Sequence, residues 1–82
     1  MHSIDVLEEA IELAESSGFE VRREFLGESN GGACRIAGQW LLFVDLSLPT
    51  GEQLEQVVSG LRSSGVVTPR PSTSAALRSL LG

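Results

Sequence analysis

The chain has 82 residues, of which 41% are hydrophobic and 21% are charged, and its formal net charge at pH 7 is −5. These values exclude a second hydrophobic core and a chain that stays disordered, because so few residues fill only one core and their apolar fraction is typical of globular proteins. The acidic balance argues against a nucleic acid partner, since phosphate binding requires a basic face.

No stretch of the sequence has the pattern of a membrane span or a secretion signal. The longest apolar run, residues 40–44, is far shorter than the roughly 18 residues that cross a bilayer, and residues 1–5 lack a positively charged region. Cys34 is the only cysteine, which excludes an internal disulfide and favours a reducing compartment. We therefore expect a cytoplasmic protein without membrane contact. All six basic residues are arginine, which indicates a GC-rich, bacterial genome.

An amphipathic helix is predicted over residues 3–17. Ser3 is a suitable cap for its start, and Gly18 is suited to the left-handed conformation that commonly ends a helix. Glutamates occupy one side of this helix. Apolar residues recur on the other side at helical spacing, and they include Ile4, Leu7, Ile11 and Ala14.

The segment after Gly18 changes to the alternating pattern of β-strands. Strands are predicted over residues 19–25, 33–37 and 40–47. Asn30-Gly31 and Gly38-Gln39 are predicted to be two-residue turns, because tight hairpins favour glycine and asparagine at positions of positive φ. The three strands would then form an antiparallel meander.

The predicted turns determine which strand residues share a face of the sheet. With Gly38-Gln39 as a turn, Cys34 lies opposite Phe43. The apolar residues predicted to share the core face are Phe19, Val21, Phe25, Cys34, Ile36, Leu41 and Phe43. A shift of one residue in a turn would instead bring to that face Trp40, Leu42 and Val44.

A second amphipathic helix is predicted after the sheet. Thr50 and Gln53 have the spacing of a capping box at its start, and Gly65 is placed to end it. Its apolar stripe consists of Leu54, Val57, Val58 and Leu61.

The last part of the chain, residues 69–82, is predicted to be a proline-containing linker and a short C-terminal helix. Pro69 and Pro71 interrupt regular structure, and Ser72 or Ser74 can cap the helix. Residues 1–68 are predicted to form a single α+β domain of order α-β-β-β-α. In this domain two main helices cover one face of a three-stranded antiparallel meander.

Residues 27–32 form a glycine-rich segment that invites comparison with phosphate-binding loops. The segment lacks the P-loop lysine and the dinucleotide fingerprint, and it leads into a strand rather than a helix, so we interpret it as a turn. Cys34 is interpreted as a small buried core residue, since the adjacent Arg35 points to the opposite face. The candidate binding residues are Asn30, Gly31, Gly32, Cys34, Trp40 and Asp45.

Asp45 and Trp40 also have structural interpretations. Asp45 interrupts an apolar strand, and we expect it to accept amide hydrogen bonds from the nearby loop or to pair with an arginine. Trp40 fits either a core or an interface. A zinc site made of His2, Cys34 and Asp45 lacks a fourth ligand. The sequence therefore predicts no metal site, no cofactor and no catalytic residue.

Two functional hypotheses follow from these observations. The favoured one is a non-catalytic protein-interaction module that self-associates, because the third strand is apolar on both faces while one helical layer covers only one. The second face would be covered by the C-terminal segment or by a second copy, so a homodimer is expected, with another protein as a further possible partner. The alternative is a small thiol-dependent or ligand-binding enzyme that uses Cys34, Asp45 and residues 27–32.

Overall fold

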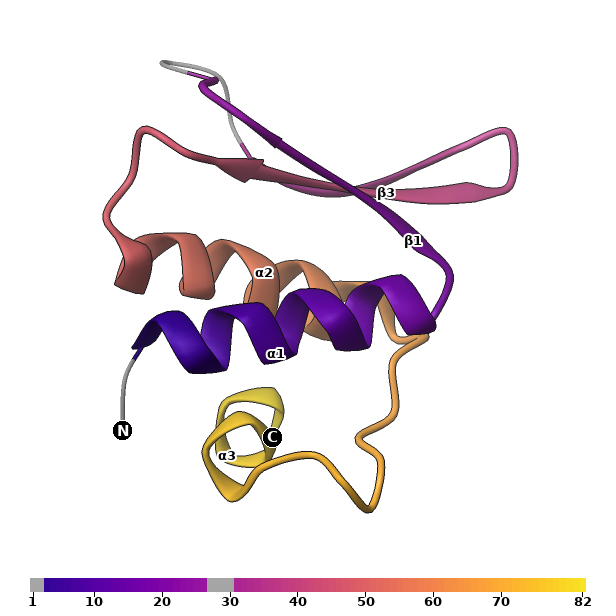
Figure 1. Ribbon diagram of the computed structural model, residues 1–82. Coiled ribbons are helices and arrows are strands. Elements are labelled where there is room, and N and C mark those ends of the chain that lie inside the picture. Colours follow the sequence, from indigo (N-terminus) through magenta and orange to yellow (C-terminus); the bar gives the residue numbers. More distant parts are fainter. Residues whose placement is uncertain (1–2, 27–30) are drawn as a thin grey trace.

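The computed structural model describes residues 3–26 and 31–82 as an α+β fold of three layers (Figure 1). The sheet forms the first layer, α1 and α2 lie side by side beneath it, and α3 lies on their far side. The order α-β-β-β-α followed by a short helix is confirmed. The elements are α1 (Ser3–Ser16), β1 (Phe19–Glu24), β2 (Gly32–Ile36), β3 (Gln39–Asp45), α2 (Thr50–Ser64) and α3 (Ala75–Leu81).

The sheet has the strand order β1-β3-β2, with β1 parallel and β2 antiparallel to β3. The predicted antiparallel meander is therefore wrong. Asn30-Gly31 does not join neighbouring strands, because β1 and β2 lie on opposite sides of β3; Asn30 itself lies outside the described residues. The most apolar strand, β3, takes the centre, where it gains a neighbour on each side and the best cover from solvent.

The turn between β2 and β3 begins one residue earlier than predicted. Ala37 and Gly38 both have positive φ, at 51° and 81°, as in the turns whose twist suits a two-residue hairpin. Ile36 therefore pairs with Gln39, and Cys34 pairs with Leu41 rather than Phe43.

The core face of the sheet differs from the predicted one on β2 and β3, and Phe25, also predicted for this face, lies just after β1 and is 78% exposed. Leu42 and Val44 of β3 are fully buried against the helices, and β1 brings Phe19 and Val21 to the same side as expected. Four residues of β2 and β3 that were predicted as core do share one face, but this face is turned away from the helices. These residues are Cys34, Ile36, Leu41 and Phe43. The shifted alternative with Trp40, Leu42 and Val44 is the observed core face.

The two main helices follow their predicted patterns closely. Gly18 and Gly65 adopt positive φ, at 102° and 70°, where α1 and α2 end. The predicted capping box is wrong, since Pro49 is the N-cap of α2 and no side chain caps it. The side-chain amide of Gln53 instead donates to the Leu48 carbonyl at 2.8 Å. Residues of α1 that pack in the core are Val6, Leu7, Ala10, Ile11, Leu13 and Ala14.

Gly60 allows α2 to approach the sheet closely. A β-carbon at Gly60 would lie 2.8 Å from Leu42 Cδ1 and 3.3 Å from Ala33 Cβ. Distances this short show that β2 and β3 leave no room for a side chain at this position. The small residues Gly60 and Ala33 thus set the spacing between α2 and β2.

The C-terminal helix is held against α1 by its own cap. The Ser74 hydroxyl accepts a hydrogen bond from the Leu77 amide at 3.2 Å and donates to Glu9 at 2.6 Å, while the Ser74 amide donates to Glu9 at 2.7 Å. These bonds from Ser74 lower the pKa of Glu9. Leu77 is fully buried. Of the two covers considered for the second sheet face, the C-terminal segment is excluded, because α3 packs on the helices instead.

Within residues 3–26 and 31–82, every helix is too short or too polar to cross a lipid bilayer.

Candidate interaction surface

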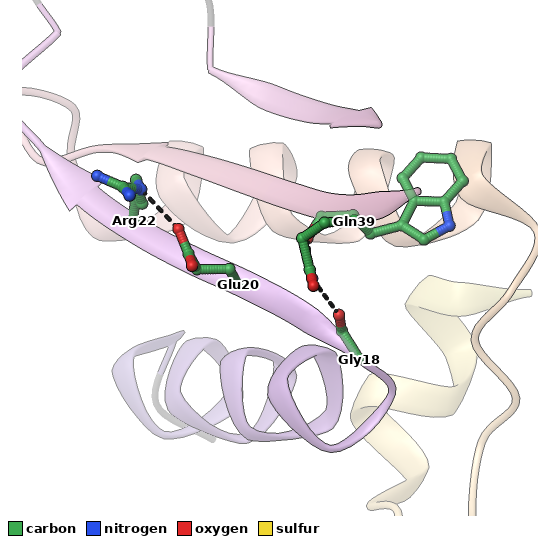
Figure 2. Close-up of polar contacts among 5 residues, drawn as sticks. Gly18, Glu20, Arg22 and Gln39 are labelled. Atoms are coloured by element: carbon green, nitrogen blue, oxygen red, sulfur yellow. Dashed lines mark hydrogen bonds and ion pairs between the residues drawn. The ribbon is translucent and has the colours of Figure 1, made fainter. Parts of the chain in front are cut away.

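The side of the sheet turned away from the helices is the main uncovered surface of the described chain (Figure 1). Alternation along the strands places the charged residues Glu20, Arg22 and Glu24 of β1 on this open face. The Arg22 Nε donates to the Glu20 carboxylate at 2.8 Å (Figure 2). The apolar residues of the open face come from β3 and β2, and they are Leu41, Phe43, Cys34 and Ile36.

The open face is therefore divided into a charged half at β1 and an apolar half at β2. Ile36 is 59% exposed at the β2 side, whereas Leu41 and Phe43 are partly buried by their neighbours. Phe25, directly after β1, is 78% exposed but lies at the opposite edge of the sheet from Ile36. Apolar residues that gather in one place, as on the β2 side, are typical of interaction surfaces.

The start of β3 is fixed by polar contacts at the rim of the open face. The Gln39 side-chain amide donates to the Gly18 carbonyl at 2.8 Å (Figure 2) and to the Trp40 carbonyl at 3.0 Å. These bonds connect the turn after α1 to the first residues of β3. They hold the sheet in place beside the helices without covering its open face.

The outer edge of β2 is unpaired among the described residues, because β2 pairs only with β3. Ile36 and Gln39 flank a two-residue turn, and such residues form a hydrogen-bonded pair in a hairpin. Hydrogen-bonded pairs alternate along antiparallel strands. Ala33 and Arg35 therefore direct their amide and carbonyl groups away from β3, where a further strand could bind them.

Trp40 and Cys34, both predicted site residues, lie on opposite faces of the sheet. The Trp40 ring packs on the helix side at 5.5 Å from the Phe19 ring, and the Arg35 guanidinium lies 5.9 Å from the Trp40 ring centroid. Cys34 is half-buried on the open face. The interpretation of Cys34 as a core residue is therefore wrong, because β2 directs the Cys34 side chain to the face away from the helices.

Asp45 connects three segments of the chain at the end of β3. Its side chain, 2% exposed, accepts hydrogen bonds from the Leu26 amide at 3.2 Å and from the Ser47 amide and hydroxyl at 2.9 and 2.6 Å. Its own amide donates to Gln56 of α2 at 2.9 Å. The Ser47 hydroxyl, followed by the amide bonds, lowers the pKa of Asp45 below the ordinary 3.8.

The described part of the glycine-rich segment borders a polar hollow of about 420 Å³. Gly31 and Gly32 line it on one side, and Glu52 and Glu55 of α2 lie on the other. Cys34 does not reach the Asp45 end of the sheet, because Leu41, its partner on β3, precedes Asp45 by four residues, or about 13 Å along a strand. The candidates Cys34, Trp40 and Asp45 are thus dispersed.

The outer side of α2 forms a further surface, which was not among the predicted sites. A groove of about 750 Å³ runs along this helix, with Leu54, Val58 and Leu80 of α3 among its lining residues. Glu55 and Arg62 lie at its rim, seven residues apart and both exposed. No local sequence pattern indicates this groove, because it includes Leu80 and so depends on the packing of α3.

Acid is expected to weaken the fold through Asp45. Its pKa is lower when folded than when unfolded, so Asp45 stabilises the fold above about pH 4 and this contribution is lost as the pH falls through the folded pKa. In Asp45→Asn the fold should be less stable at pH 7 and lose less stability between pH 5 and 2. Urea unfolding of both proteins across this range measures the difference. Parallel curves would show that the bonds to Asp45 do not depend on its charge.

Comparison of the chain with protein-family models, with curated proteins and with solved structures finds no match. The surfaces of the molecule itself are therefore the only basis for a functional proposal. Among these, the β2 side of the sheet combines exposed apolar side chains with an unpaired strand edge.

Proposed function

We propose that the chain is a small non-catalytic protein-interaction module that self-associates through the β2 side of its sheet. One observation carries this proposal: the apolar residues of the open face gather beside the unpaired edge of β2. A strand edge and an apolar patch at one place offer hydrogen bonds and buried area to the same partner.

A second copy of the chain is the partner that the arrangement favours. The C-terminal helix packs on α1 and α2 and is fixed there by Ser74 and Glu9, so it does not supply the cover. Symmetric dimers are the commonest assemblies of soluble proteins. The single cysteine also favours action in a reducing compartment such as the cytoplasm.

The enzyme hypothesis has less support. It requires Cys34, Asp45 and residues 27–32 to act together, yet Cys34 and Asp45 are separated along the sheet. The Asp45 oxygen Oδ1 accepts three hydrogen bonds from its own chain, which gives this carboxylate a structural role. The second candidate partner for the same open face is a different protein.

Ile36→Glu is expected to abolish self-association, because it places a charge in the apolar half of the open face. Ile4→Glu is the matched control, since Ile4 is 58% exposed against 59% for Ile36 and lies at the start of α1. Size exclusion with light scattering should report dimers for the parent and the Ile4 variant and monomers for the Ile36 variant. Equal masses for the two variants would contradict the proposal.

A further inference from the structure

We infer that two copies join through antiparallel pairing of their β2 strands around a two-fold axis at Cys34, so that two three-stranded sheets become one continuous sheet. This inference rests on the proposed self-association and specifies its geometry. The register of β2 and the shape of its open face support this geometry.

The hydrogen-bonding pattern of β2 favours an axis at Cys34. With this axis, all five residues of β2 (Gly32–Ile36) pair with the second copy, and the outward groups of Ala33 meet those of Arg35. An axis at Arg35 would place two guanidinium groups directly opposite each other, which is destabilising. An axis at Ala33 would leave Ile36 paired with a residue outside the strand.

The same axis matches the shapes of the two open faces. Ile36 of one copy then lies opposite Gly32 of the other, and Gly32 has open space where its side chain would be. Gly32 in turn pairs with Phe43. The most exposed apolar residue of β2 thus enters the gap beside Phe43 of the second copy, and the contact shields part of both side chains from water.

The direction of α2 determines how the helical layers are placed in the joined sheet. Gly31 lies against Gln56 and Ala33 against Gly60, so α2 runs in the same direction as β2. Antiparallel pairing of β2 therefore makes the two α2 helices antiparallel on one side of the joined sheet. The axis at Cys34 lies one residue beyond Ala33 and so passes α2 near its end, at Arg62, and the exposed acidic residues near its start, Glu52 and Glu55, point away from the second copy.

Cys34 is the most direct reporter of this arrangement. On the axis it faces Cys34 of the second copy in a pair without mutual hydrogen bonds, whose Cα atoms lie about 4.5 Å apart. This separation lies within the roughly 4.4–6.8 Å range of disulfides. Copper phenanthroline with oxygen should therefore convert the full-length protein rapidly and nearly completely to a covalent dimer, visible on non-reducing gels.

The double variant Cys34→Ser/Ser79→Cys provides the control, because Ser79 is exposed on α3, on the far side of the helical layer. Under the same oxidation it should form covalent dimers at least tenfold more slowly. Equal rates for the two thiols in a protein that light scattering shows to be dimeric would overturn the Cys34 axis and leave self-association intact. A monomeric parent at high micromolar concentration would overturn both.

Discussion

Leu42→Ala is expected to lower the free energy of unfolding by about 3 kcal/mol, whereas Leu41→Ala should lower it by less than about 1.5 kcal/mol. Leu42 is fully buried between the sheet and the helices, while Leu41 lies partly buried on the open face. The cavity left by Leu42 is enclosed by core side chains, but the space left by Leu41 is open to water. Urea unfolding of the two variants at one fixed concentration measures both losses.

The pair of variants tests the orientation of β3 directly. The substitutions are chemically identical and are adjacent on one strand, so strand propensity and unfolded-state effects are matched. A larger loss for Leu41 than for Leu42 would mean that the faces of β3 are reversed, and that Phe43 rather than Val44 belongs to the core.

Gly60→Val is expected to destabilise the protein by about 2 to 3 kcal/mol, as overpacking of a filled interior does. The new side chain would meet Leu42 and Ala33, and α2 would have to move away from β2 and β3. This outcome opposes intrinsic propensity, since glycine is a poor residue for a helix interior. Thermal and urea unfolding monitored by circular dichroism measure the change.

Gly51→Ala is the control on the same helix. A β-carbon at Gly51 has open space around it, so this variant should be neutral or more stable by up to about 1 kcal/mol. If Gly60→Val were as stable as the parent, the close contact between α2 and β2 would be absent, and the direction inferred for α2 along β2 would lose its support.

The helices were the most predictable part of the fold. Their apolar residues recur at helical spacing, and glycines end them, so α1 and α2 could be located from local patterns alone. The start of α2 was less predictable, because Thr50 and Gln53 matched a capping box while Pro49 took the cap position. Ser74 was correctly among the two predicted caps of α3.

The arrangement of the strands could not be read from local patterns. The apolar run that forms β3 has apolar residues on both faces, so its periodicity does not show which face packs in the core. The predicted turn between β2 and β3 was Gly38-Gln39, whereas the observed turn requires positive φ at Ala37, a conformation that residues with a β-carbon adopt infrequently. The parallel pairing of β1 with β3 depends on contacts between residues distant in sequence.

The candidate site was only partly predictable for the same reason. The hydrogen-bonded role expected for Asp45 depends on its local turn and is observed. Cys34 and Trp40 lie on opposite faces with both the predicted and the observed turn, because each turn pairs Cys34 with an odd-numbered residue of β3. Local patterns did not determine which of the two faces packs against the helices. The free edge of β2 follows from the observed strand order. In the predicted meander β2 would have been the central strand, with both of its edges paired.

Sedimentation equilibrium of the full-length parent protein between low and high micromolar concentration is the most direct test of self-association through the β2 side. We predict a mass that rises with concentration to twice that of one chain, and the mass of one chain for Ile36→Glu at the same concentrations. A parent protein that keeps the mass of a single chain throughout this range would contradict it.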